Sequence, residues 1–135
     1  MRPVLPDVDG LVTAALRQGL SGATVRVMWP QDWADRLPLV VAARVPGGTT
    51  DARGLDVALV DVQAVATDRR EASRLARVAR VVLADACRAQ YRGPDGYLSR
   101  FADVSGPAEI RTGAPSPGPE LFRFQATYRV TARPI

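Results

Sequence analysis

Two segments of the chain place apolar side chains at steps of three and four residues, the spacing that is typical of an amphipathic helix. The first covers residues 7–20, with Asp7 positioned as an N-cap and Gly19 or Gly22 positioned to end the helix. The second covers residues 68 to about 91 and is the more regular of the two. Its apolar positions fall within one arc of the helix and are Ala72, Leu75, Ala76, Ala79, Val82, Leu83, Ala86 and Cys87.

Alternation of apolar and polar residues predicts strands elsewhere in the chain. These strands cover residues 23–29, 37–45, 55–67, 97–104, 108–111 and 121–133. Residues 46–54 begin with Pro46-Gly47-Gly48 and predict an antiparallel hairpin with a long tip between the second and third strands. In the last strand Phe122, Phe124 and Tyr128 share one face, which we expect to lie in the core.

The order of these elements indicates the fold class. A helix is followed by three strands, a second helix, two short strands and a closing strand. The chain has 135 residues, a length that suits one compact domain over residues 1–135. We therefore expect a single α+β domain with a mainly antiparallel sheet and two helices packed on one face of it.

The composition excludes several kinds of catalytic chemistry. All 18 basic residues are Arg, and the chain contains no His and no Lys. Without His there is no Ser-His-Asp or Cys-His nucleophile and no imidazole metal site. Without Lys there is no Schiff base and no phosphate-loop lysine. We therefore expect no enzymatic activity and no cofactor.

The remaining reactive side chains do not form a site by their spacing. Asp56 and Asp61 are five residues apart on one predicted strand, so they point to opposite faces and do not form a carboxylate metal site. Cys87, the single cysteine, lies on the apolar arc of the second helix, where it is expected to be a small buried hydrophobic side chain. These positions predict no bound metal and no reactive thiol.

The net charge of +4 has two interpretations. Arginine neutralises phosphate, so an excess of arginine is typical of nucleic-acid binding. A GC-rich genome explains the same excess, since Lys and Asn, which have AT-rich codons, are both absent and Ile occurs only at Ile110 and Ile135. The 14 acidic residues make the surface mixed rather than uniformly basic.

The second helix has a charged face opposite its apolar arc. Asp68 and Glu71 have the spacing of a capping box at its start, and Asp85 lies near its end. A face of this kind is either the solvated side of the helix or a surface that meets another subunit or a polyanion. Its arginines are Arg70, Arg74, Arg77 and Arg88.

The predicted loops supply the other candidate binding residues. Gly47 and Gly48 are expected at the hairpin tip with Asp51 and Arg53. A phosphate cradle is the alternative for the two glycines, but the loop joins two strands instead of leading into a helix N-terminus.

Two further segments are rich in proline or tryptophan. Residues 113–119, which include Pro115 and Pro117, predict a stiff, exposed excursion without regular structure. Trp29 and Trp33 flank a loop as an exposed aromatic pair, either as a lid over the core or as an interface anchor.

The pattern as a whole resembles the tail terminator, or tail completion, proteins of long-tailed bacteriophages. The resemblance covers nearly the full chain and is strongest in "LPLVVAARVPGGTTDARGLDVALVDVQAVATDRREASRLARVARVVL" and in the closing "GPELFRFQATYRVTARP". Within these stretches the matching features are the strand that ends at Pro46-Gly47-Gly48, the helix start at Asp68 and the late Arg123-Phe124 strand. These motifs mark a fold and not a catalytic site.

The resemblance implies a virion structural protein, assembled in the host cytoplasm and placed at the head-proximal end of the tail. Such a protein forms a homo-oligomer, a six-fold ring that caps the tail tube, stops polymerisation of the tube protein and offers a docking surface to the head-tail connector. DNA would pass through the lumen without sequence-specific binding, and no membrane is involved. The arginine face of the second helix would then supply charge for the contact between subunits. The loops at residues 46–54 and 113–120 are long enough to reach a neighbouring ring or the tube lumen.

Two alternative functions fit the same sequence. One is another neck or connector subunit of the same kind of particle. The other is a small nucleic-acid-binding module that uses the arginine face of the second helix.

Overall fold

The computed structural model describes residues 3–111 and 120–135. Along the chain the elements are α1 (Val8–Gly19), β1 (Thr24–Arg26), the short 3-10 helix η1 (Trp33–Arg36), β2 (Leu39–Thr50), β3 (Asp56–Ala66), α2 (Arg69–Arg88), β4 (Gly96–Ile110) and β5 (Phe122–Pro134). Both predicted helices are confirmed, and so are their N-caps. The Asp7 carboxylate accepts a hydrogen bond from the Gly10 N–H, and the Asp68 carboxylate accepts one from the Arg70 N–H.

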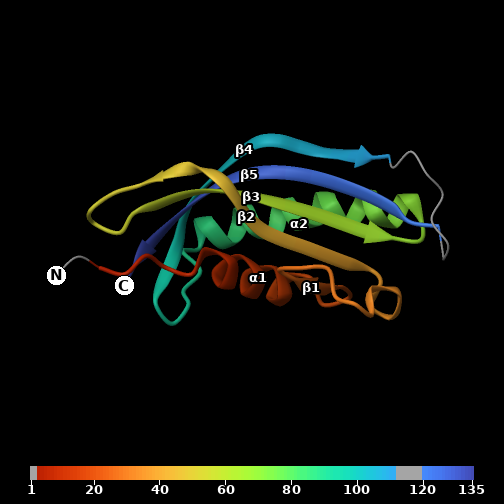
Figure 1. The fold of residues 1–135 in the computed structure, drawn as a ribbon, viewed down its shortest axis with the longest axis horizontal. Coiled ribbons are helices and arrows are strands. Elements are labelled where there is room, and N and C mark those ends of the chain that lie inside the picture. The colour runs from red at the N-terminus through yellow and green to blue at the C-terminus, as the bar shows by residue number, and fades with distance from the viewer. Residues whose placement is uncertain (1–2, 112–119) are drawn as a thin grey trace.

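The strands form one five-stranded sheet in the order β1-β2-β3-β5-β4 (Figure 1). β1 runs parallel to β2, and the other neighbouring strands are antiparallel. Helix α1 packs against β1 and β2, and α2 packs against β3, β5 and β4. Their apolar sides belong to one core cluster, so both helices cover the same face of the sheet. The expected α+β fold, with a mainly antiparallel sheet and two helices on one face, is confirmed.

The main core forms where the alternating apolar positions of β3 and β5 meet the apolar arcs of the helices. Tyr128 on β5 and Leu16 on α1 are among the largest fully buried side chains. Of the apolar arc of α2, Ala72, Ala76, Ala79, Leu83 and Cys87 are buried. Phe124 and Tyr128 lie in the core as predicted, while Phe122 is half-buried at its margin.

A second, smaller core lies on the opposite face of the sheet. Leu39, Val41 and Val65 form it, and all three are buried. Trp29 and Trp33 pack over them with their rings edge to face and 6.1 Å between centroids. Of the two interpretations of this tryptophan pair, the structure shows a lid, although the core beneath it is this small one.

The predicted antiparallel hairpin between the second and third strands is confirmed, but its loop is shorter than the predicted residues 46–54. Strand β2 continues through this segment to Thr50, because Pro46 and Gly47 form a bulge between the pairs Val45–Leu59 and Gly48–Ala58. Gly48 has a φ of +88°, and a Cβ at this position would lie 2.0 Å from the carbonyl oxygen of Val57. The two glycines therefore sit within a strand and not at the hairpin tip.

The tip itself is a tight turn between Thr50 and Asp56. The Asp51 carboxylate accepts hydrogen bonds from the N–H groups of Arg53, at 2.9 Å, and of Leu55, at 3.1 Å. These local hydrogen bonds replace the hydrogen bonds between the strands at the point where the chain reverses direction. The tip lies at the same end of the molecule as the C-terminus (Figure 1).

Three other predicted boundaries change. The two short strands predicted over residues 97–104 and 108–111 form one strand, β4, whose register along β5 shifts near Arg100, Ser105 and Gly106. The first strand, predicted over residues 23–29, keeps only Thr24–Arg26, since β1 pairs with three residues of β2. The second begins at Leu39 and not at residue 37. The neighbour of β4 is one continuous strand, β5. Turn-forming residues in β4 are therefore accommodated as bulges, and β4 remains a single strand.

Candidate interaction surfaces

The arginines predicted on the outer face of α2 are exposed, as the helical spacing indicates. Arg88 lies 3.5 Å from Asp85 one turn earlier on the same helix. Arg70, Arg74 and Arg77 make no ion pair within residues 3–111 and 120–135. These three residues, here called the α2 arginine row, follow each other at steps of four and three positions and so share one side of the helix.

The other arginines of α2 hold the helix to the edge strand β4. The Arg80 guanidinium donates to both carboxylate oxygens of Asp103, at 2.6 and 2.7 Å, and Arg69 donates to Glu109 at 2.6 Å. The hydrogen bond from Arg80 lowers the pKa of Asp103. Sequence reasoning missed both pairs, because their members are 23 and 40 residues apart and nothing in the local pattern indicates the pairing.

Beside the tip of the β2–β3 hairpin, where β3 begins, Asp56 forms an ion pair with Arg44. Asp56 is fully buried and accepts two hydrogen bonds from the Arg44 guanidinium. The backbone N–H of Arg44 donates in turn to the Asp9 carboxylate of α1, at 2.7 Å. These contacts join the hairpin to the first helix.

Asp61 lies on the opposite face from Asp56, as predicted. Its carboxylate accepts hydrogen bonds from the Gln125 amide at 2.9 Å and from the Thr127 hydroxyl at 2.7 Å. Across residues 3–111 and 120–135, no group of three or more Asp, Glu, Cys or His side chains is placed to hold a metal ion.

The structure does not bring the predicted loop residues together as one surface. At the hairpin tip Asp51 and Arg53 pair with each other at 3.0 Å. Gly47 and Gly48 lie within the strand, away from the tip. Pro115 and Pro117 lie outside the described residues.

Cys87 is buried in the main core and faces the sheet from α2. Burial raises the pKa of its thiol to about 12. The side chain therefore packs as a small apolar group, which confirms its predicted place in the core.

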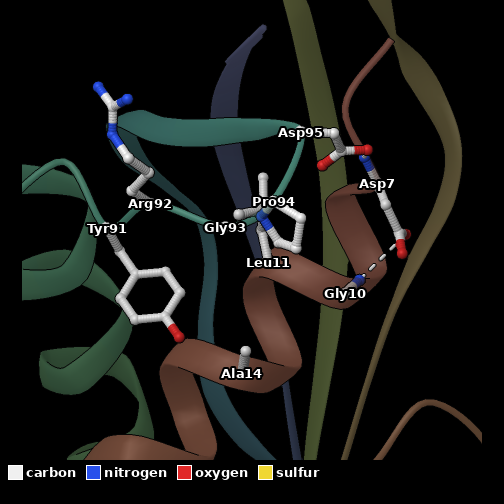
Figure 2. A pocket seen from close by; sticks show the side chains of 9 residues that line it. All are labelled: Asp7, Gly10, Leu11, Ala14, Tyr91, Arg92, Gly93, Pro94 and Asp95. Carbon is white, nitrogen blue, oxygen red and sulfur yellow. Dashed lines mark hydrogen bonds between the residues drawn. The ribbon is translucent and has the colours of Figure 1, made fainter. Parts of the chain in front are cut away.

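A hollow of about 660 Å³ lies between the first half of α1 and the turn that joins α2 to β4 (Figure 2). Its floor includes Leu11 and Ala14 of α1. At one side the Asp95 carboxylate accepts a hydrogen bond from the Asp7 N–H at 3.3 Å, while the Asp7 carboxylate accepts one from the Gly10 N–H at 3.1 Å. The side chain of Arg92 points away from these carboxylates in Figure 2. No sequence motif indicated this hollow, because α1 and the turn are distant in the chain.

The described part of the chain holds no helix that is both long and apolar enough to cross a membrane.

Comparison with known proteins supplies the identity. None of the curated proteins matches the chain. A family model described as phage tail termination protein matches residues 4–135. Because this match spans nearly the whole chain, the protein belongs to the phage tail termination protein family.

Proposed function

We propose that this tail terminator assembles into a ring of six chains, which caps the tail tube, stops polymerisation of the tube protein and provides the docking surface for the head connector. Family membership supports the terminator role and makes the protein a structural component of the virion. In this proposal the ring assembles in the host cytoplasm, occupies the head-proximal end of the tail, catalyses no reaction and lets DNA pass without reading its sequence.

The observation that most supports the proposed ring is the α2 arginine row. Arg70, Arg74 and Arg77 are exposed on one side of a rigid helix and have no carboxylate partner among the described residues. Neighbouring arginines of the same helix, Arg69 and Arg80, do have such partners on β4. A row of cations left without internal partners favours a complementary surface on another molecule.

The hollow beside α1 provides such a surface on a second copy of the chain. An arginine side chain has an apolar stem and a charged end, so it is suited to a site that combines both properties. The stem would lie on Leu11 and Ala14, and the guanidinium would meet the carboxylates of Asp7 and Asp95. We assign this hollow as the receiving side of the subunit contact.

The two surfaces lie at different places on the subunit, as a head-to-tail contact requires. The α2 arginine row lies in the half of α2 that follows β3, whereas the hollow lies beside the turn after the other end of that helix. A contact between two different surfaces is heterologous, and repeated head to tail it generates a ring when the rotation closes.

Charge reversal tests this contact. We expect Arg74→Glu with Arg77→Glu to abolish the ring, measured as mass by light scattering, while the subunit keeps the folded circular dichroism spectrum of wild type. Adding Asp95→Arg to the same chain should restore part of the ring, because the reversed charges again face each other. The matched control is Arg53→Glu with Arg88→Glu, which changes the net charge equally at residues that pair locally. A ring that survives the first double substitution would contradict the contact.

A further inference from the structure

The face of the sheet that the helices leave open carries a group of arginines on its last two strands. Alternation along β5 places Arg123, Arg129 and Arg133 on this face, opposite the buried Phe124 and Tyr128. On β4 the bulge after Leu98 turns Arg100 to the same side, since Leu98 and Phe101 both face the main core.

The register brings three of these arginines together. Arg100 pairs with Thr131, and Ala102 pairs with Arg129. Arg100 is therefore a diagonal neighbour of both Arg129 and Arg133, a separation that long side chains can bridge. We call Arg100, Arg129 and Arg133 the sheet arginine cluster.

The carboxylates near this cluster are directed elsewhere. Asp103 and Glu109 of β4 point to the helix side, where they bind Arg80 and Arg69. Asp61 lies on the open face but already accepts hydrogen bonds from Gln125 and Thr127. Within residues 3–111 and 120–135, no member of the sheet arginine cluster makes an ion pair.

The chemistry of this face matches the backbone of nucleic acid better than the surface of an acidic protein. Arginine guanidinium groups are among the donors that contact phosphate in protein–DNA complexes. Arg129 and Arg133 are four residues apart on one strand, a span of about 13 Å. That span equals about four base-pair steps of 3.4 Å measured along the axis of a duplex. The α2 arginine row, in contrast, is interspersed with Glu71 and Asp68.

We propose that the sheet arginine cluster is a binding site for the phosphates of nucleic acid, independent of base sequence. The proposal extends the proposed function, because it gives the passing DNA a contact surface on this chain. It differs from a nucleic-acid role for α2, since the two arginine groups lie on different faces of the fold.

Fluorescence anisotropy of a short labelled duplex of mixed sequence tests the site. Affinity is measured between about 50 and 200 mM salt, where the slope of log affinity against log salt reports the number of phosphates neutralised. We expect Arg100→Gln with Arg129→Gln to weaken binding and to reduce that slope by about two. The control, Arg53→Gln with Arg88→Gln, removes the same charge from exposed, locally paired residues and should leave the slope unchanged.

Three results would overturn the proposal. Wild type could fail to bind the duplex at the lowest salt, or both double variants could lose the same affinity, which would reduce the effect to net charge. Polyglutamate could also bind as tightly as the duplex, which would indicate an acidic protein partner.

Mass by light scattering on the same samples separates this proposal from the ring. A monomer that binds duplex with the expected slope supports the site and contradicts the ring, whereas a ring that ignores duplex does the reverse.

Discussion

The ion pair between Arg44 and Asp56 shows how a residue of one strand can help to hold a distant helix, α1, in place. Asp56 is completely buried, and the fold accepts the cost of that charge only because Arg44 donates two hydrogen bonds to it. The Arg44 side chain is one-third exposed, so solvent screens part of the interaction. Through the backbone of Arg44 the same pair reaches Asp9 on α1.

Replacing Asp56 by Ala should therefore destabilise the protein. The substitution leaves a guanidinium without its partner and a cavity beside the tip of the hairpin. We expect the free energy of unfolding, measured by urea titration, to fall by about 2 kcal/mol, less than for a fully buried pair. The exposed pair Asp32–Arg36 provides the control, because Asp32→Ala should leave the unfolding midpoint unchanged. Equal effects of the two substitutions would contradict this account.

At Gly48 the fold of strand β2 requires a residue without a side chain. Its positive φ and its contact with the Val57 carbonyl leave no room for a side chain. Gly48→Ala should lower the free energy of unfolding by about 2 kcal/mol. Gly22→Ala is the matched control, since a Cβ there meets no atom within 4 Å. Thermal melts of both variants check the prediction, and a wild-type melting temperature for Gly48→Ala would refute it.

At the scale of elements, α2 could be predicted from sequence almost completely, whereas β2 and β4 could not. The arc from Ala72 to Cys87 and the cap at Asp68 are local signals, and the structure confirms both. Pro46-Gly47-Gly48 is also a local signal, but pairing with β3 on one side converts the expected loop into a bulge.

The candidate surfaces divide in the same way. Helical spacing correctly predicted that Arg70, Arg74, Arg77 and Arg88 are exposed. The spacing could not show that these four arginines differ from Arg69 and Arg80, whose carboxylate partners lie on β4, much later in the chain. The hollow at Asp7 and Asp95 depends on a contact across 88 residues, which no periodicity records.

The junction between α2 and β4 should depend on pH. Arg80 lowers the pKa of Asp103, so the folded state binds this proton more weakly than the unfolded state does. The resulting stability is present above the unfolded pKa of about 3.9 and is lost as pH falls through the lower folded pKa. We expect Arg80→Gln to lower the melting temperature at neutral pH but not at a pH below both values. Arg77→Gln, which removes an unpaired arginine, should show no such pH dependence.

At the scale of the whole molecule, the distribution of charge gives each face a separate role. The acids of β4 neutralise two arginines of α2, which leaves the α2 arginine row facing outward and the sheet arginine cluster on the open face. We propose that the α2 arginine row meets a neighbouring subunit and that the sheet arginine cluster contacts nucleic acid, whereas Arg69 and Arg80 hold α2 to β4. These groups include eight of the 18 arginines of the chain.

The proposed function requires that the chain closes into a ring on the end of a tail tube. This ring can be tested through mass by light scattering, on the purified protein alone and after mixing with its tube protein. We predict the mass of six chains, either in isolation or on the tube end, and tubes that stop growing once the protein is added. A mass of one chain under both conditions, with tubes that continue to lengthen, would contradict the account.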